Sequence, residues 1–287
     1  MKVFLNGQLV NKQDAKISIF DHGFLYGDGA FEGIRAYKGL VFKLQEHIDR
    51  LYETCHTMMI QPPMTSKQMI KAITDTLKAN KLQDAYIRVI VTRGEGDLGL
   101  DPKKCRGNAS VVIITDKITL YPPELYKKGM EIITVPTLQN HPDALNPQLK
   151  SLNYLNNIMA KIEASNAGYN EAIMMDANGY VTECTGDNIF LVKKGVLSTP
   201  EQSHLKGITR QAVLDIAKKL KIETQERFIT RHEVYTAEEC FLTGTAAEVI
   251  PIVKVDGRQI GTGKPGKVTA QLIKKFKEAT TKEGVRY

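Results

Sequence analysis

The sequence predicts a fold of two α+β domains in which helices accompany mainly antiparallel strands. At about 150 residues per domain, the 287 residues suffice for roughly two domains. Short β-branched segments with alternating apolar residues predict strands, and they lie between segments with apolar residues at helical spacing. The composition is globular, with 42% hydrophobic and 25% charged residues. Such a chain can form a hydrophobic core without metal or disulfide cross-links.

The first part of the chain mixes short strands with two helices. A hairpin is predicted over residues 2–10, because the Asn-Gly pair in KVFLNGQLV suits a two-residue turn. Residues 40–59 begin as a strand and continue as a helix, and residues 65–81 open with a Ser/Thr cap and are helical. Residues 84–94 and 109–118 alternate and are β-branched, so they are predicted strands.

Two consecutive prolines mark the expected boundary between the domains. Pro122 and Pro123 break regular structure, so we expect an interdomain connection over residues 122–128. This places a small N-terminal domain at residues 1–121 and a larger C-terminal domain at residues 129–287.

The second part is expected to combine hairpins with helices. Gly-rich and Asn-Gly turns separate its apolar segments. Strands are predicted over residues 130–137, 171–184, 188–200 and 239–261, and amphipathic helices over residues 207–223 and 266–284.

Lys150 lies directly before a further helical pattern. An amphipathic helix is predicted from the recurrence of Leu152, Leu155, Ile158, Met159 and Ile162, and Gly168 ends it. A lysine is costly in a core, and a positive charge at a helix N-terminus is unfavourable by about 0.3–1 kcal/mol. Lys150 is therefore either a solvated charge at a helix entry or a group that points into a site.

Composition excludes several classes of protein. The four cysteines are scattered and form no CxxC pair, so neither a metal site nor a thioredoxin-type motif is predicted. The N-terminus lacks the apolar stretch of a signal peptide, and no segment has the roughly 20 apolar residues of a membrane span. We therefore expect a cytoplasmic protein in a reducing compartment.

The net charge of +7 raises the question of nucleic acid binding. The lysines lie between helically spaced apolar residues, as in AKKLKIE, which is typical of solvated helix faces. There is no arginine-rich tract and no nucleic-acid-binding signature. We expect no nucleic acid partner and no membrane partner, whereas an anionic small molecule suits the positive charge.

Two glycine-containing segments are candidate anion sites. GITR, residues 207–210, stands where a helix begins, so its backbone N–H groups and the Thr209 hydroxyl can hold a phosphate. The turn over residues 244–247 has small side chains that let the backbone approach a ligand. Taken alone, each is explained as well by ordinary structure, since Thr209 is a common type of helix cap and residues 244–247 form a corner between elements.

Glu183 completes a candidate site. It shares a strand face with Val181, so its carboxylate is either partly buried and in need of a cation, or exposed at the strand end. A lysine amine, a phosphate cradle and such a carboxylate are what pyridoxal phosphate requires. The lysine forms a Schiff base, N–H groups hold the phosphate, and the carboxylate keeps the pyridine nitrogen protonated. The residues therefore suggest pyridoxal phosphate as the cofactor, although each signal is weak alone.

Seven segments, in the same order along nearly the whole chain, resemble the branched-chain amino acid aminotransferases. They are DHGFLYGDGAFEGIRAY, KLQEHIDRL, YIRVIVTRGEGDLGLDP, LKSLNYLNNIMA, NGYVTECTGDNIF, GITR and FLTGTAAEVIP. The resemblance implies the two-domain pyridoxal phosphate fold type IV, with a small N-terminal α/β domain and a larger C-terminal domain with a barrel-like β core. It also implies a homo-oligomer built from dimers.

The resemblance also implies the residues that hold the cofactor. Lys150 would bind it covalently and move the proton, and Glu183 would face the pyridine nitrogen. The other implied contacts are Arg50 with Gly207, Ile208, Thr209 and Thr245 at the phosphate, Leu205 against the ring, and Tyr154 at the ring oxygen.

The substrate pocket is implied in the same way. Its walls would be Tyr26, Phe31, Gly33, Tyr86 and Tyr154. The Thr245–Ala246 backbone and Tyr86 would take the α-carboxylate, Arg88 the distal carboxylate of glutamate, and Leu100 would reach the pocket from a neighbouring subunit.

The implied reaction is a ping-pong transamination between branched-chain L-amino acids and 2-oxoglutarate. Two relatives of the same fold compete, D-amino acid aminotransferase and aminodeoxychorismate lyase, but FEGIR at residues 31–35 and RGEGDLGL at residues 93–100 favour the branched-chain group. A non-catalytic basic binding protein is a distant alternative. It would lack the lysine or the glutamate of the motifs, and both are present here.

Overall fold

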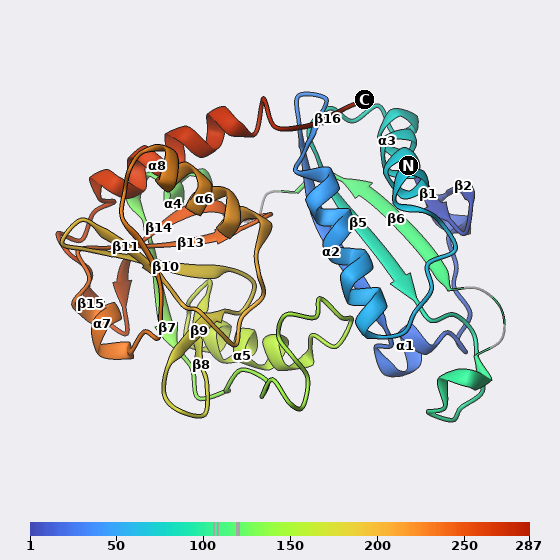
Figure 1. Cartoon of the computed structure of the whole chain (residues 1–287), viewed down its shortest axis with the longest axis horizontal. Coiled ribbons are helices and arrows are strands. Elements are labelled where there is room, and N and C mark those ends of the chain that lie inside the picture. Colours follow the sequence, from blue (N-terminus) through green and yellow to red (C-terminus); the bar gives the residue numbers. More distant parts are fainter. Residues whose placement is uncertain (106, 108, 119–120) are drawn as a thin grey trace. The chain divides into compact units, whose positions relative to one another are not determined.

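A computed structural model of the chain describes residues 1–105, 107, 109–118 and 121–287 (Figure 1). The fold is mixed, with two β-sheets and helices around them. This agrees with the α+β class that the sequence predicts.

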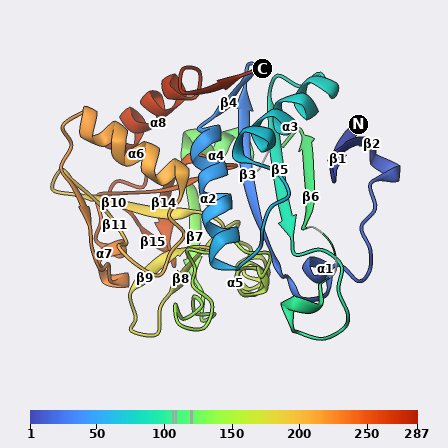
Figure 2. The ribbon, with the colours of Figure 1, turned by 45° about the vertical axis from the view of Figure 1, so that its right-hand side comes forward.

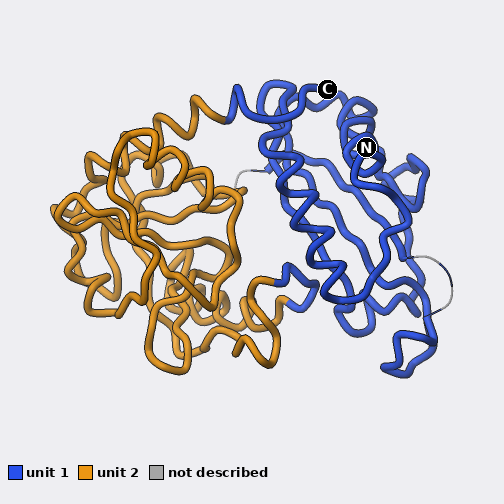
Figure 3. Tube along the Cα trace, viewed as in Figure 1, with its two compact units in different colours: residues 1–118, 149–153, 280–287 blue, residues 119–148, 154–279 orange. Residues whose placement is uncertain are grey.

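The chain divides into two compact units (Figure 3). Unit 1 comprises residues 1–118, 149–153 and 280–287, and unit 2 comprises residues 119–148 and 154–279. Two short segments therefore return to unit 1 from the second half of the chain, and one of them contains Lys150. Sequence patterns alone did not indicate either return.

Unit 1 is built on an antiparallel sheet, seven-stranded over its described residues, in the order β16-β4-β3-β5-β6-β1-β2. The strands are β1 (Lys2–Leu5), β2 (Gln8–Asn11), β3 (Gly29–Tyr37), β4 (Leu40–Phe42), β5 (Ala85–Thr92), β6 (Ser110–Asp116) and β16 (Gly284–Arg286). The Asn6–Gly7 turn between β1 and β2 has positive φ at both residues, which confirms the predicted hairpin.

Two helices, α2 (Leu44–Thr57) and α3 (Ser66–Ala79), cover one face of this sheet (Figures 1 and 2). Thr65 and Gln68 form a capping box that starts α3, as the sequence predicts. The core between helices and sheet includes Ile34, Ile48 and Ile73, all fully buried. The remaining helical turns of the unit are η1 (Lys12–Asp14), α1 (His22–Tyr26) and η2 (Pro102–Lys104).

Unit 2 is built on a mixed sheet, nine-stranded over its described residues, in the order β12-β11-β10-β13-β14-β7-β8-β9, with β15 paired to β14. The strands are β7 (Met130–Thr134), β8 (Ala172–Met175), β9 (Val181–Cys184), β10 (Asn188–Lys193), β11 (Val196–Thr199), β12 (Thr224–Glu226), β13 (Glu239–Gly244), β14 (Glu248–Val255) and β15 (Arg258–Gln259). The terminal strand β9 also contacts β10, so the sheet curls, which confirms the predicted barrel-like core.

The helices of unit 2 are α4 (Pro123–Lys128), α5 (Leu155–Asn166), α6 (Ile208–Lys219), α7 (Arg231–Tyr235) and α8 (Lys267–Ala279). Helices α6 and α8 contact each other, and both contact β13 (Figure 1). These confirm the helices predicted within residues 207–223 and 266–284, although each ends earlier than predicted, and Gly284 already belongs to β16.

The expected break in regular structure at the prolines is wrong. Helix α4 begins at Pro123, and Leu125 and Tyr126 pack against the core of unit 2. Proline is tolerated in the first helical turn, because its missing N–H would have no partner within the helix.

Helix α5 differs from its prediction in two ways. It begins at Leu155 rather than Leu152, and its apolar stripe faces outward, with Leu155 68% and Ile158 51% exposed. Ala160 and Ala164 are its buried residues, since small side chains let the helix approach the sheet. The stripe that the sequence shows is therefore not a core face of this chain.

Candidate active site

Lys150 lies in an extended segment of unit 1 that pairs with the edge of β3. The Phe31 N–H donates to the Lys150 carbonyl oxygen at 2.9 Å, and Asn153 Nδ2 donates to the Gly27 carbonyl oxygen at 2.8 Å. The Lys150 side chain is half-buried, and its Nζ lies 4.6 Å from the centre of the Phe31 ring. Backbone pairing thus fixes the position of the Lys150 Cα, and a cation–π contact with the Phe31 ring orients the amine.

Four of the predicted pocket residues share the face of the unit 1 sheet that α2 and α3 leave uncovered. The register pairs Gly33 with Arg88, and alternation places Phe31 and Tyr86 on the same face. Arg88 Nη2 donates to the Tyr86 hydroxyl at 3.0 Å, and its guanidinium carbon lies 4.4 Å from the Phe31 ring centre. A Cβ at Gly33 would lie 2.2 Å from the Tyr86 hydroxyl, so only glycine leaves room for this arrangement.

Arg50 lies on α2 and is held by a buried carboxylate. Its Nε and Nη2 donate to Glu32 at 2.7 Å and 2.9 Å. Glu32 also accepts from His47 Nδ1 at 2.7 Å. The guanidinium of the predicted phosphate ligand is therefore part of a buried ion pair rather than a solvated helix charge.

Tyr26 and Leu100 belong to α1 and to the loop between β5 and β6. The Tyr26 hydroxyl donates to the Leu98 carbonyl oxygen at 2.6 Å, and the His22 ring Nε2 lies 2.9 Å from the Asp97 carbonyl oxygen. Leu100 is 80% exposed in this chain. The loop is thus fastened to α1 along its first half while it presents Leu100 outward.

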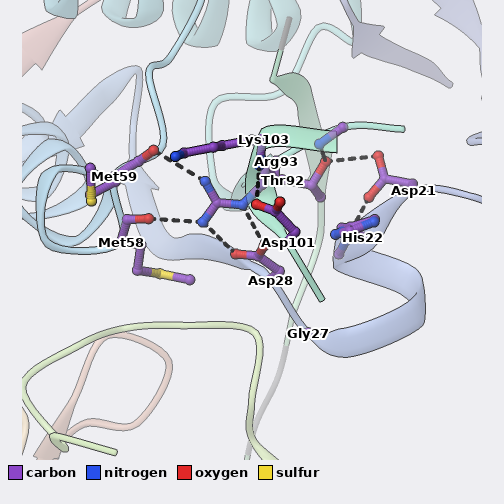
Figure 4. A network of polar contacts seen from close by, with 12 residues as sticks. Asp21, His22, Gly27, Asp28, Met58, Met59, Thr92, Arg93, Asp101 and Lys103 are labelled. Atoms are coloured by element: carbon purple, nitrogen blue, oxygen red, sulfur yellow. Dashed lines mark hydrogen bonds and ion pairs between the residues drawn. The ribbon is translucent and has the colours of Figure 1, made fainter. Parts of the chain in front are cut away.

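Arg93 fixes the base of the same loop (Figure 4). It makes a bidentate ion pair with Asp28, in which Nη2 donates to Oδ1 at 3.0 Å. The same guanidinium donates to the carbonyl oxygens of Met58 at 2.8 Å and Met59 at 3.1 Å, at the end of α2. One side chain therefore ties together the start of β3, the end of α2 and the loop.

Glu183 is buried on β9 of unit 2 and is surrounded by donors. Gln139 Nε2 donates to one of its oxygens at 2.8 Å. The Leu205 N–H, at 3.1 Å, and Asn188 Nδ2, at 3.3 Å, donate to the other. Of the two alternatives that the sequence left open for Glu183, the structure shows the buried one. These three neutral donors orient the two carboxylate oxygens.

The N-terminus of α6 lies beside this carboxylate. The N-cap residue is Gly207, which has no side chain to cap the first N–H groups of the helix, those of Ile208 and Thr209 among others. Asn188 Nδ2 also donates to the Leu205 carbonyl oxygen at 2.9 Å, which joins the segment before α6 to Glu183. A Cβ at Gly207 would lie 2.1 Å from Asn188 Oδ1, so the approach requires glycine.

The turn between β13 and β14 contains Thr245 and Ala246, both half-buried. A Cβ at the preceding Gly244 would lie 1.8 Å from Asp187 Oδ1, so Asp187 packs directly against the turn. Burial and then the negative charge of Glu171 raise the pKa of Asp187 to about 8. Asp187 is therefore mostly protonated at neutral pH.

Tyr154, the last of the predicted cofactor contacts, precedes α5 in unit 2. It is half-buried, and its carbonyl oxygen accepts from the Ile158 N–H at 2.9 Å. The predicted residues thus fall into two sets. One set, in unit 1, contains Tyr26, Phe31, Gly33, Arg50, Tyr86, Arg88, Leu100 and Lys150, and the other, in unit 2, contains Tyr154, Glu183, Leu205, Gly207, Ile208, Thr209, Thr245 and Ala246.

These groups suit pyridoxal phosphate. Unit 1 offers a lysine amine over an aromatic ring and an oriented guanidinium. Unit 2 offers an oriented carboxylate for a pyridinium nitrogen, an uncapped helix N-terminus for a phosphate and two close-approach glycines. Each of these groups therefore matches one part of the cofactor.

Sequence reasoning missed the residues that support these groups. Glu32 shares the core face of β3 with Ile34, and a charged residue in such a position needs a partner. The sequence alone could therefore have indicated that Glu32 is paired. Gln139 and Asp187 gave no comparable signal, because their contacts join segments distant in sequence or loops whose geometry the sequence does not specify.

Within the described part of the chain, no helix is long and apolar enough to cross a membrane. The residues that the structure describes also contain no group of three or more His, Cys, Asp and Glu side chains placed to bind a metal ion. All four cysteines are free thiols, and burial raises the pKa of Cys55 and Cys240.

Residues 29–255 match the family model described as amino-transferase class IV. The match covers most of the chain, and the chain therefore belongs to the class IV aminotransferase family, an enzyme family with the pyridoxal phosphate fold inferred above. The prediction of fold and family is confirmed.

Relatives within the family are branched-chain-amino-acid aminotransferases. A putative enzyme of that name from Methanocaldococcus jannaschii is 52% identical over 100% of this chain and 99% of its own length. The enzyme of Pseudomonas aeruginosa is 38% identical over 96% of this chain and 91% of its own length.

Solved structures of branched-chain amino acid aminotransferases are also similar to this chain. The Escherichia coli branched-chain amino acid aminotransferase has a TM-score of 0.95 at 34% identity, over 99% of this chain and 96% of that one. A branched-chain amino acid aminotransferase from T.th., solved with pyridoxamine 5'-phosphate, has a TM-score of 0.93 at 35% identity, over 98% of this chain and 94% of that one. Its bound cofactor is the amino form of the one inferred here.

Proposed function

We propose that this aminotransferase transfers the amino group of leucine, isoleucine and valine to 2-oxoglutarate, with pyridoxal phosphate as its cofactor. The observation that carries the proposal is Lys150, whose backbone is paired to β3 and whose amine lies over Phe31. The names of its relatives support branched-chain substrates. The phosphopyridoxyl-glutamate bound in another structure of the T.th. enzyme supports glutamate as the product of the second half-reaction.

When bound, pyridoxal phosphate supplies an aldehyde that accepts the amino group and a ring that withdraws electrons from the substrate Cα. The residues of the chain direct that chemistry. Lys150 would take the proton from Cα with its neutral amine and return it to the cofactor carbon. Glu183 would hold a proton on the pyridine nitrogen, and its three donors keep its oxygens in place.

The remaining residues would bind and orient. Arg50 and the N–H groups at the start of α6 would hold the phosphate, together with Thr209 and Thr245. Leu205 would pack against the ring, and Tyr154 would bind the ring oxygen.

The substrate pocket must accept both an isobutyl group and a carboxylate. Phe31 and Tyr86 supply apolar surface, and the Arg88 guanidinium lies over the Phe31 ring. A cation that lies against an aromatic face can leave the apolar wall intact for leucine and still reach the distal carboxylate of glutamate. Gly33 keeps the space in which Tyr86 lies. The Thr245–Ala246 backbone would bind the α-carboxylate.

A homo-oligomer built from dimers is part of the proposal. The exposed apolar residues of α5, and Leu100 on its fastened loop, are surfaces that self-association would bury. Leu100 would then reach a neighbouring copy's pocket. A cytoplasmic location is likewise proposed.

Visible absorbance of the purified protein tests the function. A cofactor band that bleaches with L-leucine and returns with 2-oxoglutarate is the expected result. Bleaching only by D-leucine or D-alanine would indicate a D-amino acid aminotransferase, and indifference to all amino acids would indicate aminodeoxychorismate lyase. Either outcome would contradict the proposal.

A further inference from the structure

Glu32 is a fully buried carboxylate whose two oxygens accept three hydrogen bonds. One oxygen accepts from Arg50 Nε at 2.7 Å. The other accepts from Arg50 Nη2 at 2.9 Å and from His47 Nδ1 at 2.7 Å. The contact with Arg50 is bidentate, which fixes the plane of the guanidinium as well as its position.

Secondary structure brings these three groups together. His47 and Arg50 are three residues apart on α2, so they share one face of the helix. Alternation along β3 directs Glu32 to the side that α2 covers, whereas Phe31 and Gly33 face the opposite side. The arrangement thus lies buried between α2 and β3 of unit 1.

The charges of the cluster follow from burial and proximity. Burial alone would raise the pKa of Glu32, but the charge of Arg50 and the hydrogen bonds from His47 and Arg50 lower it to about 2. Burial, together with the positive charges of Arg50 and Lys150, lowers the pKa of His47, although the charge of Glu32 and its hydrogen bond oppose this. At neutral pH the cluster is an ion pair of Glu32 with Arg50, and a neutral His47 donates its Nδ1 proton.

We infer that Glu32 is a positioning residue, which fixes Arg50 in the orientation that binds the cofactor phosphate. This rests on the proposed function, in which Arg50 is a phosphate ligand. Arginine has five N–H donors in a rigid plane, and Glu32 occupies two of them. Because the plane cannot rotate, the directions of the other three are fixed as well.

Electrostatics and positioning predict opposite results when the Glu32 charge is removed. Glu32 partly neutralises Arg50, so charge alone would make a Glu32→Gln variant bind phosphate more tightly. Positioning predicts weaker binding, because glutamine keeps at most one of the two contacts and the guanidinium is freed to turn. The sign of the change therefore decides between the two roles.

The experiment measures how much the phosphate contributes to cofactor affinity. Cofactor-free full-length protein is titrated with pyridoxal 5'-phosphate and with pyridoxal, which has the same ring and aldehyde but no phosphate. The Kd of pyridoxal divided by the Kd of pyridoxal 5'-phosphate isolates the phosphate contribution. In Glu32→Gln we expect that ratio to fall about tenfold or more, which corresponds to the loss of a charge-assisted hydrogen bond, while the pyridoxal Kd changes little.

Two Arg50 variants keep the inference testable if Glu32→Gln does not fold. Arg50→Lys keeps the charge beside Glu32 but lacks the planar fork, so the ratio should fall nearly as far as in Arg50→Met. A preserved ratio in Arg50→Lys would show that orientation is dispensable, and an unchanged or higher ratio in Glu32→Gln would show the same. Either result overturns the inference.

Other outcomes separate this inference from the proposed function. A wild-type protein that binds no pyridoxal phosphate would overturn both, whereas an Arg50→Met variant with an unchanged ratio would overturn this inference and leave the transamination itself standing. Asn80→Ala is the matched control for stability in unit 1, since it removes three hydrogen bonds to Lys2 and Thr115 and touches neither Arg50 nor Glu32. It should lower Tm without a change in the ratio, and the ³¹P resonance of its bound phosphate should match the wild type, whereas that of Glu32→Gln shifts.

Discussion

A Glu183→Gln substitution would test the role proposed for Glu183 in unit 2. The carboxylate accepts from Gln139 on one oxygen and from Asn188 and the Leu205 N–H on the other. A glutamine retains the latter two contacts only if its NH₂ group faces Gln139 Nε2, so one bond is lost and two donors oppose each other. Gln139 cannot simply turn over, because its Oε1 already accepts from the Asn140 N–H at 2.8 Å.

The loss of that buried contact should destabilise the cofactor-free protein by about 1–3 kcal/mol. For a unit of this size, the Tm falls by roughly 2–12 °C. Activity should fall more steeply, by about 100-fold or more in kcat, because the neutral amide no longer favours a protonated pyridine nitrogen. Thermal unfolding followed by circular dichroism and steady-state kinetics with L-leucine measure both effects.

Glu171→Gln is the matched control for this substitution. Glu171 is also buried in unit 2, and one of its oxygens accepts from the backbone of Ala172 and Thr185, a contact that a glutamine oxygen retains. The kcat of the Glu171→Gln variant should stay within about threefold of wild type, because Glu171 has no role in the chemistry. A Glu183→Gln variant that keeps wild-type kcat would refute the assigned role of Glu183.

Three further substitutions test other parts of the structure. Gly33→Ala places a Cβ 2.2 Å from the Tyr86 hydroxyl, so KM for L-leucine should rise about tenfold while Tm falls by a few degrees; an unchanged KM would contradict the pocket assignment. Arg93→Ala removes the bidentate pair with Asp28 and two carbonyl contacts, and should cost about 1–3 kcal/mol in urea unfolding, against little change in the exposed-pair control Asp75→Asn. The pKa of Asp187 is raised to about 8, so its contribution to stability is complete below the ordinary pKa near 3.8 and is lost as the pH rises through 8. Asp187→Asn should therefore be more stable than wild type at pH 8 and lose less stability between pH 5 and pH 8, and an identical pH dependence of the urea midpoint would contradict that account.

Local patterns predicted much of the fold because they depend on neighbouring residues. The Asn6–Gly7 hairpin, the Thr65 capping box and helix α6 follow from turn chemistry and periodicity. The outward stripe of α5 could not be predicted in this way, because the same pattern describes a core face and a surface that another molecule covers. Which of the two applies depends on tertiary packing, here on the small residues Ala160 and Ala164.

For a related reason, the sequence predicted some residues of the candidate site and not others. Lys150 and Glu183 stand in segments that resemble a known family, so their positions were recognisable. Glu32 and Gln139 act through contacts with residues 18 and 44 positions away in sequence. No local pattern specifies such partners, although a carboxylate on the core face of β3 implies that one exists.

The most direct test of the central claim is the visible spectrum of the wild type and of Lys150→Ala, each with pyridoxal phosphate, before and after L-leucine. We expect the wild type to show a cofactor band that bleaches with L-leucine and recovers with 2-oxoglutarate. Lys150→Ala, which has no amine to move the proton, should lose turnover by at least about 1,000-fold. A Lys150→Ala variant with wild-type spectra and turnover would contradict the central claim.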